Sequence, residues 1–118
     1  MNVRVQHIPT EQEEQIAFVG YLNARNIPFF HVPNSTWTKS WNQKRINHAM
    51  GVQPGVPDLF VFVNGSPIAI EMKRIKGATT SLAQKIWLEI LNKSSVEARV
   101  CKGCEEAIAF VEEVQRRG

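Results

Sequence analysis

The stretch Gly55 to Gly77, GVPDLFVFVNGSPIAIEMKRIKG, predicts two neighbouring strands and decides the fold. Two apolar runs, DLFVFV and PIAIEMKR, flank the dipeptide Asn64-Gly65, which is strongly favoured in two-residue hairpin turns. Pro57 stands just before the first run, at a position where no hydrogen bond to a neighbouring strand is needed. The stretch therefore predicts an antiparallel hairpin.

Three charged side chains stand in this otherwise apolar hairpin. Asp58 begins the first strand, whereas Glu71 and Lys73 lie near the end of the second. Because side chains alternate faces along a strand, Glu71 and Lys73 share one face with the small Ala69. The opposite face carries only apolar side chains: Ile68, Ile70 and Met72. A tight hairpin would bring Asp58 and Glu71 to the same end of two adjacent strands.

This arrangement of charges has a chemical explanation. Two carboxylates that lie close together repel each other, so one of them binds a proton unless a cation lies between them. Carboxylate oxygens suit Mg²⁺ or Mn²⁺ better than zinc, and Lys73 would then lie where it could orient or deprotonate a metal-bound water. The pattern indicates a divalent-metal site that hydrolyses a phosphodiester. A structural interpretation stays open, in which Asp58 is a turn residue and Glu71 with Lys73 is a solvated pair on an edge strand.

The segments around the hairpin alternate between helix and strand. Residues 9–26 predict a first helix, in which Thr10 and Glu13 have the spacing of a capping box. Its expected apolar stripe consists of Ile16, Phe18, Val19 and Leu22. The other expected elements are a strand in 27–33, a short helix in 42–50, a helix over 81–93, a strand over 97–102 and a helix over 104–117. This order predicts an α/β fold with a mixed sheet flanked by helices.

Composition limits the class of protein. The chain has 118 residues, a net charge of +3 and an apolar content of 43%, which fits a single domain spanning residues 1–118. The small excess of positive charge permits a polyanionic partner without requiring one. No run approaches the roughly 18 apolar residues of a membrane helix, and the N-terminus lacks an apolar signal core, so we expect a cytoplasmic protein with no membrane partner. Cys101 and Cys104 form a lone C-x-x-C and are expected to be a reduced, structural pair, with redox or metal roles as the alternatives.

The motifs on either side of the hairpin carry a resemblance to a known family. The segments TEQEEQ, HVPN, PGVPD, EMK and SLAQKIW follow one another over most of the chain. This order resembles the PD-(D/E)xK nuclease superfamily and, within it, the VRR-Nuc (virus-type replication-repair nuclease) family. The resemblance implies a restriction-endonuclease-like α/β core and a DNA endonuclease that depends on Mg²⁺ or Mn²⁺. It also implies a homodimer of phage or prophage origin that acts on branched DNA, particularly four-way (Holliday) junctions.

The same resemblance implies the residues of the site. Asp58, Glu71 and the backbone carbonyl of Met72 would hold the metal together with a glutamate from the first helix. Lys73 would help to generate the attacking hydroxide. Hydrolysis of this kind would leave 5′-phosphate and 3′-hydroxyl ends.

Three glutamates compete for the helical position. At about 100° per residue, Glu11 shares a stripe with Phe18 and Leu22 and would point toward the buried side. Glu13 would point nearly opposite, and Glu14 would lie to one flank. We therefore predict Glu11 as the catalytic and metal-binding glutamate, with Glu14 as the alternative.

The helix expected over 81–93 contains two residues with predicted roles, Gln84 and Trp87. Gln84 matches a glutamine that the family carries after the E-x-K motif, where it could help to hold the lysine and a phosphate. Its alternative role is a capping box with Ser81. Trp87 is expected to lie in the core.

A polar stretch before PGVPD carries most of the predicted DNA contacts. Cations neutralise phosphates, and indole rings stack on exposed bases. The residues expected to bind nucleic acid, in this stretch and after the E-x-K motif, are Asn34, Trp37, Lys39, Trp41, Lys44, Arg45, Arg74 and Lys76. The alternative for the stretch is a solvated loop whose tryptophans fold back on the core. His31 fits either a satisfied histidine at a strand end or a group close to the site.

Two other functions are compatible with this sequence. One is a nuclease fold that binds branched or single-stranded DNA without cutting it, and the intact set of Asp58, Glu71 and Lys73 argues against it. The other is a nuclease that acts on flaps, nicks or RNA. The sequence does not separate this second alternative from a junction-cutting enzyme, because substrate shape is read by loops and by the dimer interface.

Overall fold

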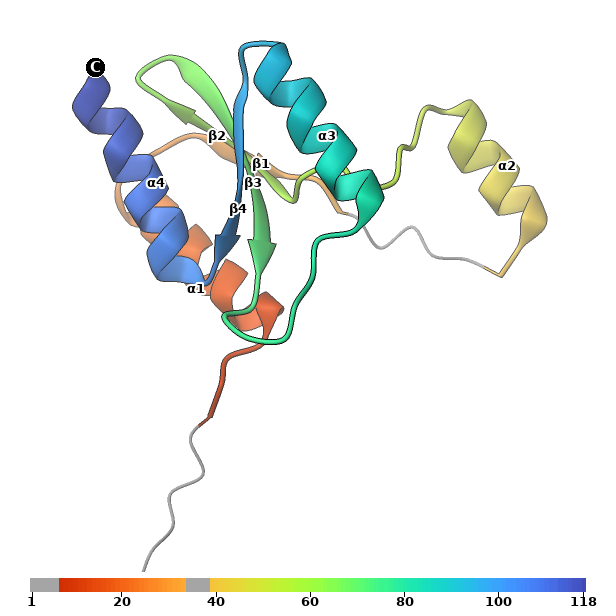
Figure 1. Cartoon of the computed structure of the whole chain (residues 1–118), viewed down its shortest axis with the longest axis horizontal. Helices are drawn as coiled ribbons and strands as arrows, with labels where there is room; N and C mark the ends of the chain where they lie inside the picture. Colours follow the sequence, from red (N-terminus) through yellow and green to blue (C-terminus); the bar gives the residue numbers. More distant parts are fainter. Residues whose placement is uncertain (1–6, 34–38) are drawn as a thin grey trace, which may run out of the picture.

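A four-stranded mixed sheet forms the centre of the structure, a computed structural model that describes residues 7–33 and 39–118 (Figure 1). The strands, in the order in which they neighbour one another, are β1 (Phe29–His31), β2 (Leu59–Val63), β3 (Ser66–Lys73) and β4 (Glu97–Lys102). β2 runs antiparallel to both β1 and β3, whereas β4 runs parallel to β3. The α/β class and the mixed sheet expected from the sequence are confirmed.

Helices lie on both faces of this sheet (Figure 1). Their bounds are α1 (Glu11–Ala24), α2 (Trp41–Ala49), α3 (Leu82–Lys93) and α4 (Cys104–Arg117). Helices α1 and α4 pack together over one face, and α3, which connects β3 to β4, lies on the other. Helix α2 stands beyond α3, away from the sheet. Within residues 7–33 and 39–118, no helix has both the length and the apolar character needed to cross a bilayer.

The predicted hairpin forms as expected. Asn64 (φ +52°) and Gly65 (φ +78°) both adopt left-handed backbone angles, which are those of a two-residue turn that matches the twist of the strands. Leu59 lies opposite Ile70 in the ladder. The core, on the face toward α1 and α4, consists of Phe18, Leu22, Leu59, Val61, Val63, Ile68, Ile70, Met72, Cys101, Ala107, Phe110 and Val111.

Helix α1 turns most of its predicted apolar stripe inward, with Phe18 and Leu22 buried and Val19 packed against the core. Its capping box between Thr10 and Glu13 is present. The buried residues of the helix are Glu14, Phe18 and Leu22, which are spaced four residues apart. Ile16, which we expected in the apolar stripe, is 63% exposed. That expectation was wrong because Ile16 and Phe18 are two residues apart, about 200° around the helix, and cannot both face the core.

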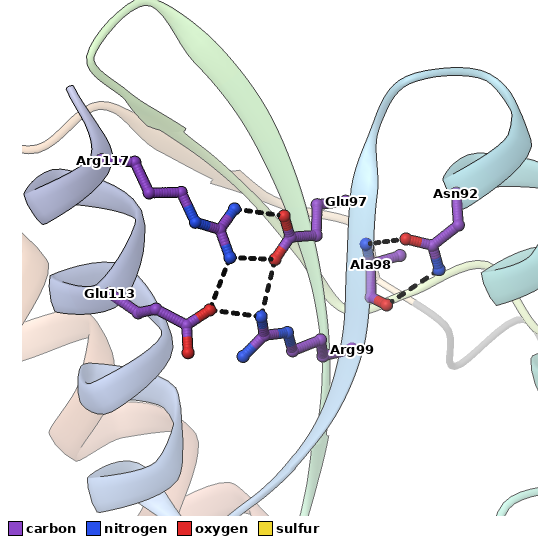
Figure 2. Close-up of polar contacts among 6 residues, drawn as sticks. All are labelled: Asn92, Glu97, Ala98, Arg99, Glu113 and Arg117. Carbon is purple, nitrogen blue, oxygen red and sulfur yellow. Dashed lines mark hydrogen bonds and ion pairs between the residues drawn. The ribbon is translucent and has the colours of Figure 1, made fainter.

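A ring of ion pairs joins α4 to the start of β4 (Figure 2). Arg117 donates to Glu97 (Nη1 to Oε1, 2.6 Å) and to Glu113 (Nη2 to Oε2, 2.6 Å). Arg99 donates to the same two carboxylates and lies with its guanidinium 4.2 Å above the ring of Phe110. These contacts fix the C-terminal helix against the edge strand.

The open edge of β4 is satisfied by side chains. The amide of Asn92, at the end of α3, donates to the carbonyl oxygen of Ala98 and accepts from its N–H, both at 3.0 Å (Figure 2). Further along the strand, the N–H of Lys102 donates to Glu106 of α4 at 2.9 Å. Because unpaired strand edges invite aggregation, these contacts protect β4. They also fix α3 at its C-terminal end, which leaves its N-terminal end to face the charged end of the hairpin.

Candidate active site

The end of the β2–β3 hairpin brings Asp58 and Glu71 together as predicted. The ladder of β2 begins at Leu59, so the next N–H along β3, that of Met72, has no backbone partner on that side. Asp58 takes its place, and its Oδ2 accepts from the N–H of Met72 at 2.8 Å. Both carboxyl groups are buried, with Asp58 8% and Glu71 2% exposed. The interpretation of these charges as a solvated surface pair does not fit this burial.

Glu71 is the carboxyl group of the site whose pKa is raised most. Burial raises its pKa to about 9, and the hydrogen bond and negative charge of Asp58 act in the same direction. Its Oε1 is buried and has no hydrogen-bond partner among the described residues. Lys73 opposes this shift only in part, because its Nζ lies 3.9 Å from Oε2 of Glu71. In the absence of a cation, Glu71 therefore holds a proton at neutral pH.

Gln84 forms the predicted capping box with Ser81 and also contacts Lys73. Its Oε1 accepts from the N–H of Ser81 at 2.9 Å, while its own N–H donates to the Ser81 hydroxyl at 3.2 Å. The same Oε1 accepts from Nζ of Lys73 at 3.0 Å. The capping box thus fixes the side chain that positions Lys73. Lys73 is itself only 9% exposed, so its ammonium is held between Gln84 and Glu71.

The two candidate helical glutamates serve different parts of the molecule. Glu14 is the buried one, and its Oε1 accepts from the N–H of Cys104 at 2.9 Å, at the start of α4. Glu11 is exposed, contrary to the inward orientation we expected, but it lines the same cavity as Asp58. Partial burial and the charge of Asp58 raise the pKa of Glu11, and Lys73 lowers it. Of the two, Glu11 is the one that faces the acidic pair.

These groups open into a cavity of about 850 Å³ between the sheet end, the start of α3 and the loop that precedes β2. Its lining consists of Glu11, Val32, Pro33, residues 51–56, Asp58, Glu71, Lys73, Ser81, Ala83, Gln84 and Trp87. Trp87, which we expected in the core, is partly exposed on this wall. The whole of α3 is similar in this respect, since none of its residues is completely buried.

Gly55 holds the loop wall of the cavity in place, a role that sequence reasoning missed. Its backbone has φ +84°, and a Cβ atom there would lie 2.5 Å from the backbone carbon of Ala83 in the first turn of α3. Only glycine allows this approach without strain. The Pro-Gly pair announces a turn, but the contact with α3 is long-range, and no local signal predicts it.

Those predicted nucleic-acid-binding residues that the structure describes do not line the cavity. Lys39, Trp41, Lys44 and Arg45 lie on or just before α2 and are exposed. Their tryptophan does not fold back on the core, since Trp41 is 77% exposed. Arg74 and Lys76 are exposed in the loop after β3. Asn34 and Trp37 lie outside the described residues.

His31 is engaged with the backbone near the site. Its Nδ1 lies 2.9 Å from the carbonyl oxygen of Asp58 and 3.1 Å from Nε2 of Gln15. The N–H of Val32 donates to the same carbonyl oxygen at 2.8 Å. β1 therefore helps to hold the backbone that carries the Asp58 carboxylate, which favours the satisfied-histidine interpretation.

The two cysteines are free thiols, as expected. Burial raises the pKa of the Cys101 thiol to about 12. A thiol with so high a pKa is a poor nucleophile and a poor metal ligand at neutral pH. Cys101 instead belongs to the apolar core.

The residues at the hairpin end fit a hard divalent cation that keeps part of its water shell. No group of three or more His, Cys, Asp or Glu side chains within residues 7–33 and 39–118 forms a ready-made metal site. Two carboxylates do converge, one of them with an unsatisfied buried oxygen, and Mg²⁺ commonly binds one or two carboxylates plus waters and substrate phosphate. The N–H of Met72 points toward Asp58, and the carbonyl of the same residue points to the same strand edge. Glu11 faces this group from α1.

The sheet order and the charged end of its central hairpin define an α/β, restriction-endonuclease-like domain. The model of the VRR-NUC domain family matches residues 18–105, a range that contains Asp58, Glu71, Lys73 and Gln84 but not Glu11. The chain belongs to the VRR-NUC family, and it is therefore a nuclease-type domain.

A solved structure described as a VRR_NUC domain protein has the same fold. It superposes with a TM-score of 0.77 at 24% sequence identity, over 95% of this chain and 93% of that chain. A comparison with curated proteins found no matching sequence.

Proposed function

We propose that this protein is a DNA endonuclease that depends on Mg²⁺ or Mn²⁺. One observation carries the proposal: Glu71 is a buried carboxyl with an unsatisfied oxygen, beside a second buried carboxyl and an ammonium group, on the wall of an open cavity. A protein that needed only stability would not retain such a group, because burying unsatisfied polar atoms is unfavourable. A divalent cation would satisfy it.

In this proposal the ligands of the cation are Glu11, Asp58, Glu71 and the backbone carbonyl of Met72. When bound, the cation lowers the pKa of a coordinated water and withdraws negative charge from the scissile phosphate. Asp58 keeps its orientation through the N–H of Met72. Glu71 would have to be ionised to serve as a ligand, and the cation would supply the positive charge that favours this form.

Lys73 and Gln84 act on the phosphate side of the site. The Lys73 ammonium donates to Oε1 of Gln84 at 3.0 Å. This hydrogen bond fixes the orientation of the lysine side chain. From there Lys73 orients the attacking water and balances the charge that develops on the phosphate. The new bond forms between the water oxygen and phosphorus while the bond from phosphorus to the 3′ oxygen breaks. The attacking water gives up a proton to the solvent and the 3′ oxygen takes one up from it, which leaves 5′-phosphate and 3′-hydroxyl ends.

The proposed substrate is branched DNA, in particular the four-way (Holliday) junction, cut by a homodimer. Symmetric cleavage of a junction needs two sites on opposite strands, which a two-fold dimer provides. The other proposed DNA contacts are Asn34, Lys39, Trp41, Lys44, Arg45, Arg74 and Lys76. The proposed unit is a single domain over residues 1–118, of phage origin, acting in the cytoplasm of a bacterial host.

Cleavage of labelled DNA tests the proposal. Four-way junction, flap, nicked and linear duplexes are incubated with Mg²⁺, with Mn²⁺ and with EDTA. Paired symmetric cuts on the junction that EDTA abolishes are the expected result. Metal-dependent cutting of another structure would keep the chemistry and discard the junction. Intact substrates in Mn²⁺ together with clear binding would replace the enzyme with a DNA-binding module.

A further inference from the structure

Helix α2 is separate from the body of the protein. It has nine residues, none of them buried, and it makes no extensive contact with another helix or strand of the described chain (Figure 1). A helix this short is marginally stable in water on its own. Its N-terminus is capped by Ser40, which accepts from the N–H of Gln43 at 3.2 Å. A capped helix with so little packing against the fold leaves its side chains available for a contact from outside.

One face of α2 collects its aromatic and basic side chains. At about 100° per residue, Lys44, His48, Trp41 and Arg45 fall within about 100° of arc. Nζ of Lys44 lies 4.7 Å from the centre of the Trp41 ring, which places the two on the same side. The indole is 77% exposed. No acidic residue opposes these cations locally, because the sequence contains no aspartate or glutamate between Glu14 and Asp58.

This face continues into the wall of the catalytic cavity. A second hollow, of about 170 Å³, is lined by Lys44, Asn47, His48, Val52 and Pro54. Val52 and Pro54 also line the cavity that contains Asp58 and Glu71. A chain that lies in the cavity can therefore pass over this loop and reach α2 without leaving the surface.

The turn between the helix and this loop is fixed. The N–H of Gly51 donates to the carbonyl of His48 at 3.0 Å, and the N–H of Val52 donates to that of Asn47 at 2.9 Å. Gly51 has φ +89°. Together these are the features of a glycine-terminated helix end. The loop carries Gly55, whose contact with α3 anchors it beside the site.

We propose that α2 binds an unpaired DNA strand that leaves the catalytic cavity, with Lys44, Arg45 and His48 on its phosphates and Trp41 stacked on a base. The inference rests on the proposed function, because it takes DNA to be what the cavity binds. An exposed indole among cations is the arrangement that holds single strands, since every base offers a face for stacking and every nucleotide offers a phosphate. The bases of a duplex are already stacked on one another and would leave the indole unused. Within branched DNA, the substrate class that follows is one with a single-stranded segment beside the scissile bond, such as a flap, in place of the fully paired four-way junction.

Binding in EDTA tests this inference independently of cleavage. Fluorescence anisotropy is measured with a blunt duplex and with the same duplex carrying a single-stranded extension on either strand. The parent protein binds an extended duplex more tightly than the blunt one. Trp41→Ala weakens binding to the extended duplex by roughly 5- to 100-fold, the value of one stacked base, and leaves the blunt duplex unchanged. Lys44→Ala/Arg45→Ala lowers the slope of log affinity against log salt by about 1.4 for the extension, as expected when two single-strand phosphate contacts are lost.

The matched control removes two cations at the far end of α1 and α4. Arg25→Ala/Arg116→Ala changes residues that line a separate hollow with Tyr21, and it leaves both affinities as in the parent. The inference is overturned if the parent binds no DNA, if it binds both duplexes equally, or if the α2 variants bind the extension as the parent does. A change in oligomeric state in the α2 variants would also overturn it, because α2 would then be a contact between copies of the chain. Because no cleavage is measured, a protein that prefers the extension but never cuts DNA would sustain this inference and refute the proposed nuclease.

Discussion

The parallel pair of β3 and β4 carries charged side chains at both ends, and the two ends satisfy them differently. Where β4 begins, Glu97 and Arg99 form a closed ring with Glu113 and Arg117 of α4 (Figure 2). Each carboxylate there meets two guanidinium groups. The hydrogen bond from Arg117 is the largest of the effects that lower the pKa of Glu97. The protein alone balances every charge at this end.

Where β3 ends, the balance fails. The ammonium of Lys73 lies 3.9 Å from Glu71, whose other oxygen has no hydrogen-bond partner among the described residues. The pKa of Glu71, about 9, measures how poorly the protein alone supports its charge. This difference supports the proposal that the charges at the end of β3 are kept for a ligand. It also predicts opposite effects of neutralising a carboxylate. At the end of β3 the change should stabilise the fold and abolish activity. At the start of β4 it should destabilise the fold and leave activity unchanged.

The largest expected effect is on the rate of cleavage. Lys73→Ala removes the ammonium that orients water and balances charge on the phosphate, and it should slow metal-dependent cutting by roughly 10²- to 10⁴-fold. Lys102→Ala is the matched control, because Lys102 is the exposed neighbour of Lys73 in the β3–β4 register. Initial rates on one substrate, with circular dichroism to confirm folding, check the pair. Equal rates for the parent and Lys73→Ala would remove Lys73 from the mechanism.

The next effect concerns the loop that borders the catalytic end. Gly55→Ala places a Cβ atom 2.5 Å from the backbone of Ala83 at a φ of +84°, and it should lower the free energy of unfolding by at least about 2 kcal/mol. Gly51→Ala has a similar φ but meets nothing within 4 Å, so it should cost only about 1–2 kcal/mol. Denaturant unfolding of both variants separates backbone strain from the clash. A smaller loss for Gly55→Ala than for Gly51→Ala would mean that the loop is not packed on α3.

Glu71→Gln tests the sign at the catalytic end. The folded-state pKa of Glu71 is raised above its unfolded value, so stability is fully present below the unfolded pKa and falls as pH rises toward about 9. The neutral amide removes this loss. In EDTA at about pH 8, Glu71→Gln should raise the free energy of unfolding by roughly 1–3 kcal/mol, with little change at about pH 4. If Glu71→Gln were less stable than the parent at about pH 8, the pKa of this carboxyl would not be raised as described.

The smallest effect is expected at the balanced end. Glu97→Gln breaks ion pairs with Arg99 and Arg117 that are partly exposed to solvent, so the melting temperature should fall by less than about 5 °C. Since the pKa of Glu97 is lowered, its contribution is present above the unfolded pKa and disappears as pH falls through the folded one. Thermal melts across acid pH check this, and the cleavage rate should stay that of the parent. A loss of activity in Glu97→Gln would mean that the ion pairs at the start of β4 also contribute to catalysis, contrary to this prediction.

The sequence predicts the hairpin and its charges well because both depend on neighbours in the chain. The alternation of side chains and the Asn64-Gly65 turn set the strands and bring Asp58 beside Glu71. The capping box of Ser81 and Gln84 is equally local. These short-range rules hold whatever else packs around them.

Features that depend on packing between distant segments were not predictable in the same way. Which of Glu11 and Glu14 faces the acidic pair depends on the position of α4, because the N–H of Cys104 at the start of that helix donates to the Glu14 carboxylate. The approach of Gly55 to α3 and the exposure of Trp87 on the cavity wall follow from the placement of a helix that periodicity alone cannot orient. Nothing in the pattern of residues 41–49 announces that their helix stands apart from the body.

The most direct test of the central claim is Mn²⁺ binding by the parent, Glu71→Gln and Glu97→Gln proteins, followed by electron paramagnetic resonance of the free ion without DNA present. The account predicts that the parent and Glu97→Gln bind Mn²⁺ alike and that Glu71→Gln loses this binding. If Glu71→Gln bound Mn²⁺ as the parent does, or if the parent bound none, the buried carboxylates at the end of β3 would not be a divalent-metal site.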